Sequence, residues 1–194
     1  MARKWSNLNL PGALHYLTGN CINRLKVFAE PACCWAFLDE LRTLNQKWPS
    51  KLISYVVMPD HFHLISNPRD GRIKEFTRDL KSRAAKALVQ SSTLEFPETE
   101  EGHQVWQESF KDVCLWSERF IWQKINYVHA NPVRARLVKS AKDYPWSSFR
   151  SFHRQGDEPL AVDHDWWWPD DSEKLSKAMK ELGWYSFGKR RKEK

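Results

Sequence analysis

Residues 54–67 read Ser-Tyr-Val-Val-Met-Pro-Asp-His-Phe-His-Leu-Ile-Ser-Asn, and this stretch decides the fold. Two apolar runs of the kind found in β-strands lie on either side of Pro59-Asp60. Proline has no N–H to donate to a strand ladder, and Pro-Asp is a turn-forming pair. The stretch therefore predicts a hairpin of two adjacent antiparallel strands.

The second strand of this hairpin carries two histidines. Side chains alternate between the two faces of a strand, so His61 and His63 share one face and Phe62 lies on the other. Neutral imidazoles on one face of a rigid strand can both reach a single divalent ion. Taken alone, such a pair is more often two half-exposed polar residues than a metal site, so other residues have to support the metal interpretation.

The composition is that of a globular protein with an excess of positive charge. The 194 residues carry a formal net charge of +7, with a pI near 9.3. A polyanion such as nucleic acid is a common partner for so basic a protein. Eleven tryptophans are present, and those that are not in the core can stack on unpaired bases.

The cysteines and the apolar runs bear on the cellular compartment. No Cys-x-x-Cys pair occurs among the four cysteines, which are Cys21, Cys33, Cys34 and Cys114. The N-terminal residues show no apolar signal core. No apolar run approaches the roughly 20 residues that span a bilayer. We expect reduced thiols in a soluble cytoplasmic protein that associates with the nucleoid.

The rest of the chain alternates between strand and helix patterns. Strands are predicted at 13–21 and 105–115, helices at 31–48 and 73–88, and a loop at 91–102. With the hairpin and a final helix after Ser117, this order gives an α+β class. Its layout is the ferredoxin-like β-α-β-β-α-β antiparallel sheet with an added C-terminal helix.

We expect one domain over residues 1–150 and a C-terminal arm over 151–194. The arm is acidic and tryptophan-rich and then basic at Lys189-Arg190-Arg191-Lys192, and its tryptophans are expected to pack back onto the domain. The helix over 73–88 exposes cations at positions that include Arg78, Lys81 and Lys86. They predict contacts with phosphate, although a solvated helix face is the ordinary alternative.

The helix after Ser117 carries Tyr127 and Asn131, four residues apart and therefore on one side. Pro132 is expected to end the helix near Ala130, because proline disfavours helical geometry in the residue before it. An aromatic core residue is the alternative for Tyr127, and a helix C-cap is the alternative for Asn131. Two imidazoles, an amide oxygen and a phenol around one point would suit Mg²⁺ or Mn²⁺.

Two motifs together resemble a known family. Residues 57–64, Val-Met-Pro-Asp-His-Phe-His-Leu, and residues 127–138, Tyr-Val-His-Ala-Asn-Pro-Val-Arg-Ala-Arg-Leu-Val, are similar to those of single-tyrosine transposases with a His-hydrophobic-His (HUH) motif. The branch that they resemble most is the REP-associated tyrosine transposases, and Asp143-Tyr-Pro-Trp-Ser-Ser148 also fits that branch. The resemblance covers residues 13–150.

The resemblance implies cleavage and joining of single-stranded or hairpin DNA, such as repeated extragenic palindromes. Tyr127 would attack a backbone phosphate to give a 5′-phosphotyrosine and a free 3′-OH. His61 and His63 would hold the metal, and Asn131 stands where related transposases have a glutamine or similar ligand. The basic side chains of Arg134 and Arg136 are further candidates for phosphate contacts.

Other interpretations remain open at this point. The chain could be a non-catalytic or domesticated DNA-binding protein, or a rolling-circle replication initiator. Related proteins work as monomers or as homodimers, and the sequence does not decide between them.

Overall fold

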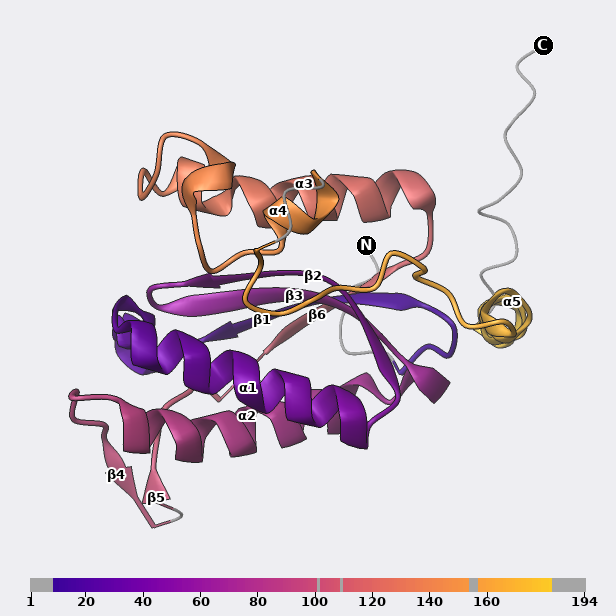
Figure 1. The fold of residues 1–194 in the computed structure, drawn as a ribbon. Coiled ribbons are helices and arrows are strands. Elements are labelled where there is room, and N and C mark those ends of the chain that lie inside the picture. The colour runs from indigo at the N-terminus through magenta and orange to yellow at the C-terminus, as the bar shows by residue number, and fades with distance from the viewer. Residues whose placement is uncertain (1–8, 101, 109, 154–156, 183–194) are drawn as a thin grey trace, which may run out of the picture.

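The computed structural model describes residues 9–100, 102–108, 110–153 and 157–182, and its elements follow the predicted order (Figure 1). The strands are β1 (Leu14–Asn20), β2 (Ser50–Met58), β3 (His61–Pro68), β4 (Glu98–Thr99), β5 (Gly102–His103) and β6 (Lys111–Leu115). The helices are α1 (Pro31–Lys47), α2 (Ile73–Ser91), α3 (Glu118–Arg134), α4 (Phe149–Phe152) and α5 (Asp171–Glu181).

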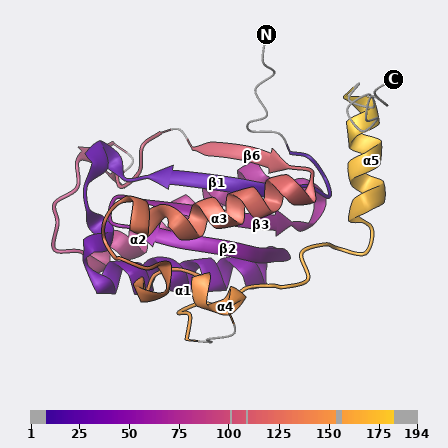
Figure 2. The ribbon, with the colours of Figure 1, turned by 90° about the horizontal axis from the view of Figure 1, so that it is seen from above.

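The main sheet has the strand order β2-β3-β1-β6, and all its neighbouring strands are antiparallel. Helices α1 and α2 cover one face and α3 crosses the other, as Figures 1 and 2 show. The predicted α+β class with an antiparallel sheet is confirmed. The alternation of β3 follows from this layering, because Phe62 and Leu64 pack toward α1 and α2 while Ile65 packs toward α3.

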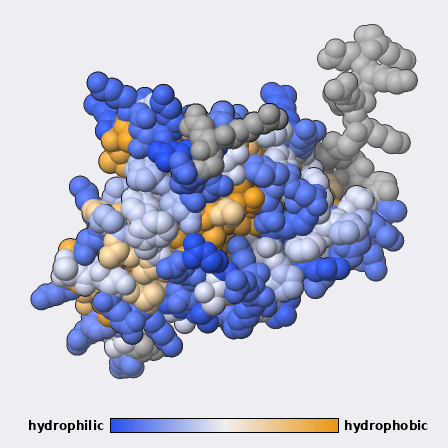
Figure 3. Space-filling view, in the orientation of Figure 1, coloured by the Kyte–Doolittle hydropathy of each residue, from blue (hydrophilic) through white to orange (hydrophobic). Residues whose placement is uncertain are grey.

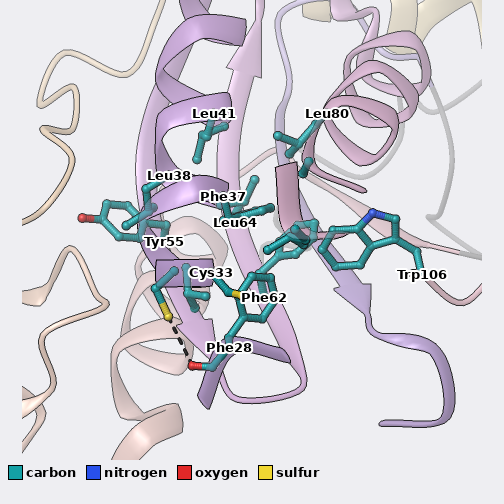
Figure 4. Close-up of a cluster of buried hydrophobic side chains, with 14 of the residues drawn as sticks. Phe28, Cys33, Phe37, Leu38, Leu41, Tyr55, Phe62, Leu64, Leu80 and Trp106 are labelled. Atoms are coloured by element: carbon teal, nitrogen blue, oxygen red, sulfur yellow. Dashed lines mark hydrogen bonds between the residues drawn. The ribbon is translucent and has the colours of Figure 1, made fainter. Parts of the chain in front are cut away.

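The larger core lies between the sheet and helices α1 and α2 (Figure 4). Its centre is aromatic: the ring centroids of Phe37 and Phe62 are 4.7 Å apart, and those of Phe62 and Trp106 are 5.5 Å apart. Each such side chain stabilises the fold by roughly 1.5–3 kcal/mol on burial. Gly19 makes room for this centre, since a Cβ there would meet the Phe62 ring at 2.4 Å. The outer surface in the view of Figure 3 is mostly hydrophilic, with only small apolar patches.

The predicted hairpin is confirmed, and neighbouring segments hold its turn in place. Met58 pairs with His61, so Pro59 and Asp60 form the two-residue turn. The carbonyl of Pro59 accepts a hydrogen bond from the Phe28 N–H, and the carbonyl of Asp60 accepts one from the Cys21 N–H, both at 2.9 Å. The first histidine therefore starts its strand from a fixed position.

Two expectations for residues 91–115 were wrong. The predicted strand over 105–115 is only Lys111–Leu115, and the expected loop contains the small β4–β5 pair. Trp106 forms an isolated bridge with Cys21, and its indole N–H donates to the carbonyl of Lys81 at 2.8 Å. The apolar residues before β6 thus leave the main sheet to pack against α2, which the strand-like sequence pattern did not reveal.

Helix α3 also differs from the prediction, because it continues through Pro132 to Arg134. A proline inside a helix leaves the carbonyl four residues earlier without its N–H partner. Here that carbonyl belongs to Val128, and the Asn131 side-chain amide lies 3.4 Å from it while donating to the Tyr127 carbonyl at 2.7 Å. Asn131 is therefore inside the helix and is not its C-cap.

His129 fixes α3 to the edge of the sheet. Its Nε2 lies 3.1 Å from Ser54 Oγ in β2 and 3.0 Å from Ser148 Oγ. Ser148 in turn belongs to a segment that pairs with β2, where the Val57 N–H donates to Trp146 and the Ser148 N–H donates to Tyr55. Burial lowers the pKa of His129 to about 4, so this side chain is neutral at pH 7.

Acid is expected to destabilise the fold through His129. Its folded-state pKa lies below the unfolded value near 6.5, so the stabilisation is complete above that pH and is lost as pH falls toward about 4. The loss in the free energy of unfolding is at most about 3 kcal/mol. Urea unfolding at pH 7 and pH 5 should show a smaller pH effect in His129→Gln than in the wild type. An equal effect in both proteins would contradict this role.

The described part of the arm packs back onto the domain, as expected. Trp168 donates its indole N–H to the Asn67 carbonyl at 3.1 Å and lies against Lys51. Buried Asp171, at the start of α5, accepts hydrogen bonds from the Asn67 side chain and the Trp168 N–H. The basic stretch Lys189 to Lys192 lies outside the described residues.

All four cysteines are buried thiols, and burial raises the pKa of Cys21 and Cys34 to about 12. Among the described residues, no helix is both long enough and apolar enough to cross a bilayer.

Candidate active site on the α3 face of the sheet

His61 and His63 lie together on the face of β3 that α3 crosses. Their ring centroids are 4.9 Å apart, and that of Tyr127 on α3 is 5.6 Å from that of His63. His63 is buried and His61 is partly buried. The hairpin motif and the motif on α3, which are more than 60 residues apart in the sequence, thus meet at one point.

Both histidines use Nδ1 for contacts within the protein. His63 Nδ1 lies 2.9 Å from the Tyr16 hydroxyl and 2.8 Å from the Thr18 hydroxyl, both on β1. His61 Nδ1 lies 2.6 Å from an Asp60 carboxylate oxygen. Such contacts fix the tautomer and ring orientation of metal-ligating histidines, and they leave Nε2 for an ion.

The electrostatics also suit a metal ligand. Burial lowers the pKa of His63 to about 3, and the nearby charges of His61, Lys124 and Arg24 act in the same direction. His63 is therefore neutral at pH 7, which is the form that coordinates metals.

Asn131 completes a set of two nitrogens and one oxygen. Its amide nitrogen donates to helix carbonyls, and the nearby side chain opposes the fall in the pKa of His63. The amide oxygen is the remaining polar atom and suits a hard cation. Two imidazole nitrogens and an amide oxygen fit Mg²⁺ or Mn²⁺ and lack the thiolates of structural zinc sites.

Tyr127 is partly buried and lies between two cations. The Lys124 ammonium is 5.3 Å from the centroid of its ring, and the Arg134 guanidinium carbon is also 5.3 Å away. Lys124 was missed in the sequence, where it looks like any lysine on an exposed helix face. Its spacing of three residues from Tyr127 is the signal that could have found it. Arg136 is exposed beyond the end of α3, at a positive φ of 59°, and no contact with another described residue places it at the site.

The three cations predicted on α2 are not part of this site. Arg78, Lys81 and Lys86 lie on α2, which covers the opposite face of the sheet. Arg78 and Lys81 line a hollow of about 700 Å³ with Glu108 and Phe110. The Gln107 carbonyl accepts from the Lys81 ammonium at 2.7 Å, and the Gln107 N–H donates to the carbonyl of Asn20, which pairs with His61 in the sheet.

A second group of possible metal ligands lies on the neighbouring strands β1 and β6. Ligand atoms of His15, Asp112 and Cys114 lie within 4.8 Å of one another, and all three residues are fully buried. His15 Nδ1 is 2.9 Å from an Asp112 oxygen, so these two form a buried pair that joins β1 to β6.

The family model described as IS200-like transposase matches residues 15–131, which include both histidines, Tyr127 and Asn131. The chain belongs to the IS200-like transposase family.

Relatives of this IS200-like transposase include bacterial proteins of the predicted branch. A candidate REP-associated tyrosine transposase of Haemophilus influenzae is 24% identical over 152 residues, which cover 71% of this chain and 80% of the relative. The REP-associated tyrosine transposase of Escherichia coli is 25% identical over 121 residues, covering 61% and 63%.

The fold is also similar to that of a solved structure. A REP-associated tyrosine transposase bound to a REP hairpin superposes with a TM-score of 0.64 at 19% identity, over 87% of this chain and 96% of that one. At this identity the likeness concerns the fold alone. The predicted resemblance to REP-associated tyrosine transposases is confirmed by the family match and these relatives together.

Proposed function

We propose that this transposase cleaves and rejoins single-stranded DNA, including hairpin DNA at repeated palindromes, through a 5′-phosphotyrosine on Tyr127. The observation that carries the proposal is the meeting of His61, His63, Asn131 and Tyr127 on one face of the sheet. Phe62 and Leu64 make their core contacts on the opposite face of β3, so that part of the core does not require the two histidines.

The nucleophile is the Tyr127 hydroxyl oxygen. It forms a bond to phosphorus while the bond from phosphorus to the 3′ oxygen breaks, and the proton lost by the phenol balances the one gained by the 3′-OH. Rejoining reverses the step, with a 3′-OH attacking phosphorus and Tyr127 leaving. Lys124 and Arg134 place positive charge beside the oxygens on which negative charge develops.

His61, His63 and Asn131 would hold the divalent ion, with Mg²⁺ or Mn²⁺ as the ions that fit. When bound, such an ion would polarise the phosphate and offset the charge on its oxygens. The residues of this chain that prepare the site are Asp60, Tyr16 and Thr18, because they orient the imidazoles through Nδ1.

The experiment that tests the proposal uses single strands that span the DNA flanking the gene. We expect a protein–DNA adduct that survives denaturation and forms with Mn²⁺ or Mg²⁺ but not with excess chelator. Binding without any cleavage under these conditions would favour a non-catalytic DNA-binding protein instead.

The cationic side chains of α2 are proposed as a second contact for the DNA backbone. We expect Arg78, Lys81 and Lys86 to contact phosphates of a strand that passes Gln107 on its way around the sheet edge. Each contact with single-stranded DNA changes the slope of log affinity against log salt by roughly 0.7. The triple alanine variant should therefore flatten this slope by about 2 and weaken all sequences alike.

A matched control removes two exposed lysines of another helix, Lys177 and Lys180 of α5. The control should keep the wild-type slope. If the triple α2 variant also keeps it, the α2 cations only solvate an exposed helix.

A further inference from the structure

A row of aromatic and cationic side chains extends from Tyr127 toward the start of α3. Phe120, Lys124 and Tyr127 follow the spacing i, i+4, i+7 and so lie on one side of the helix. Trp116 precedes the helix, and its ring centroid is 5.2 Å from that of Phe120. Lys111, at the start of β6, is the nearby charge that acts on Lys124. We refer to Trp116, Phe120, Lys124 and Lys111 as the α3 shelf.

Lys124 is the centre of the shelf, and three rings surround its ammonium group. The nitrogen lies 4.6 Å from the ring centroid of Tyr16, 5.3 Å from that of Tyr127 and 5.7 Å from that of Phe120. Cations are attracted to aromatic faces, but a ring neutralises none of the charge. Within the described ranges of the chain, neither Lys124 nor Lys111 forms an ion pair with a carboxylate.

The lowered pKa of Lys124 also indicates a site for an anion. Partial burial lowers its pKa, and the charge of Lys111 lowers it further. Two neighbouring cations without a carboxylate partner among the described residues create a site that an anion would stabilise. The rings beside them offer apolar faces at the same place, which small inorganic anions do not need but nucleotides do.

We propose that the α3 shelf binds the nucleotide next to the cleaved phosphodiester, with Lys124 and Lys111 on its phosphate and Phe120 and Trp116 against its base. This inference rests on the proposed function and adds to it a subsite on one side of Tyr127. Stacking on aromatic rings accepts any base, so the shelf would hold the strand without reading its sequence. Its task would be to keep the phosphodiester in place for attack by the Tyr127 oxygen.

A packing role is the ordinary alternative for Phe120 and Trp116. Both are partly buried, Phe120 packs against the core below α3, and the Phe120 N–H donates to the capping Ser117 hydroxyl at 3.3 Å. Apolar residues around the start of a helix often serve only to fix the angle at which the chain enters that helix. A test therefore has to separate loss of packing from loss of base contact.

Two fluorescent probes make this separation: a dT12 single strand, and a 12-mer of the same backbone with abasic tetrahydrofuran units. Both have the same phosphates, but only dT12 has bases. Phe120→Leu retains apolar packing and removes the aromatic face. We expect it to weaken dT12 binding about tenfold and to leave binding of the abasic strand unchanged.

Lys124→Met should weaken binding of both strands by a similar factor, about tenfold, because it removes a phosphate contact. The matched control is Trp122→Leu. Trp122 is on the same helix and 42% exposed, but it lies against Trp166 and Phe152 on another side of α3. This variant should bind both strands like the wild type, and melting curves should show that all three variants fold.

The outcomes separate this inference from the proposed function. If the wild type forms the metal-dependent adduct while Phe120→Leu binds dT12 normally, or Lys124→Met binds both strands normally, the shelf is refuted and the proposed function stands. Equal weakening of both strands by Phe120→Leu would also refute the shelf, since it would show a packing effect. A wild type that neither binds dT12 nor forms an adduct would refute both.

Discussion

Replacing Tyr127 by phenylalanine is expected to lower covalent attachment to DNA by roughly 1,000-fold or more, because only the nucleophilic oxygen is removed. Affinity for DNA should change little, since the ring still contacts His63 and Lys124. Adducts trapped by denaturation and separated on a gel measure the first quantity, and equilibrium binding to the same strand measures the second.

Tyr16 supplies a demanding control for this prediction. Its hydroxyl is also beside His63, at 2.9 Å from Nδ1, and its ring centroid is 6.1 Å from that of Tyr127. It is buried, however, and burial raises the pKa of its phenol, so it stays protonated. Tyr16→Phe should still form adducts. If Tyr16→Phe loses them and Tyr127→Phe keeps them, the two tyrosines have been assigned the wrong way round.

The second large effect is expected for His63→Ala, which should lower cleavage by roughly 100-fold or more and weaken the binding of Mn²⁺. The imidazole Nε2 is lost, while the core contacts of Phe62 and Leu64 on the other face of β3 remain. Metal affinity can be followed by calorimetry with Mn²⁺ alone, without DNA.

Removal of a buried ring can also disturb the fold, so a second variant is needed. His61 is more exposed than His63, and His61→Ala should show the same loss with less effect on melting. His164→Ala, which removes an exposed histidine that contacts Ser151 in the arm, should bind Mn²⁺ like the wild type. Normal cleavage by His61→Ala and His63→Ala in excess chelator would show that no metal acts at these residues.

Local sequence patterns predicted the features that depend on periodicity. The alternation of β3 placed Phe62 toward the core and both histidines on the opposite face. The spacing of four residues predicted that Tyr127 and Asn131 share one side of a helix. Periodicity alone could not predict that α3 crosses the sheet over the histidines. Only the pairing of the two motifs indicated this.

The predictions for the end of α3 and for the strand over 105–115 were wrong because side chains there form hydrogen bonds with backbone carbonyls. Pro132 indicated the end of a helix, but the Asn131 amide reaches the carbonyls of Tyr127 and Val128 and the helix continues. Trp106 looked like a strand residue, whereas its indole bonds to α2. Such contacts depend on tertiary packing and leave no periodic signal.

The sequence also did not show how the cationic side chains are distributed over the two faces of the sheet. Arg78, Lys81 and Lys86 and the motif cations Arg134 and Arg136 look alike as charges on helices, yet α2 and α3 lie on opposite faces of the sheet. Only Arg134 of these five contacts the Tyr127 ring. Lys124, which has no motif of its own, contacts it as well.

The central claim is that Tyr127 is the residue that becomes attached to DNA. Mass spectrometry of a trypsin-digested adduct tests it directly, because cleavage after Lys124 and Arg134 releases residues 125–134, in which Tyr127 is the only tyrosine. We predict that this peptide carries the nucleotide through a 5′-phosphate, and that it does so only when a divalent ion was present. A nucleotide on any other peptide, or its presence on this one after reaction in excess chelator, would contradict the account.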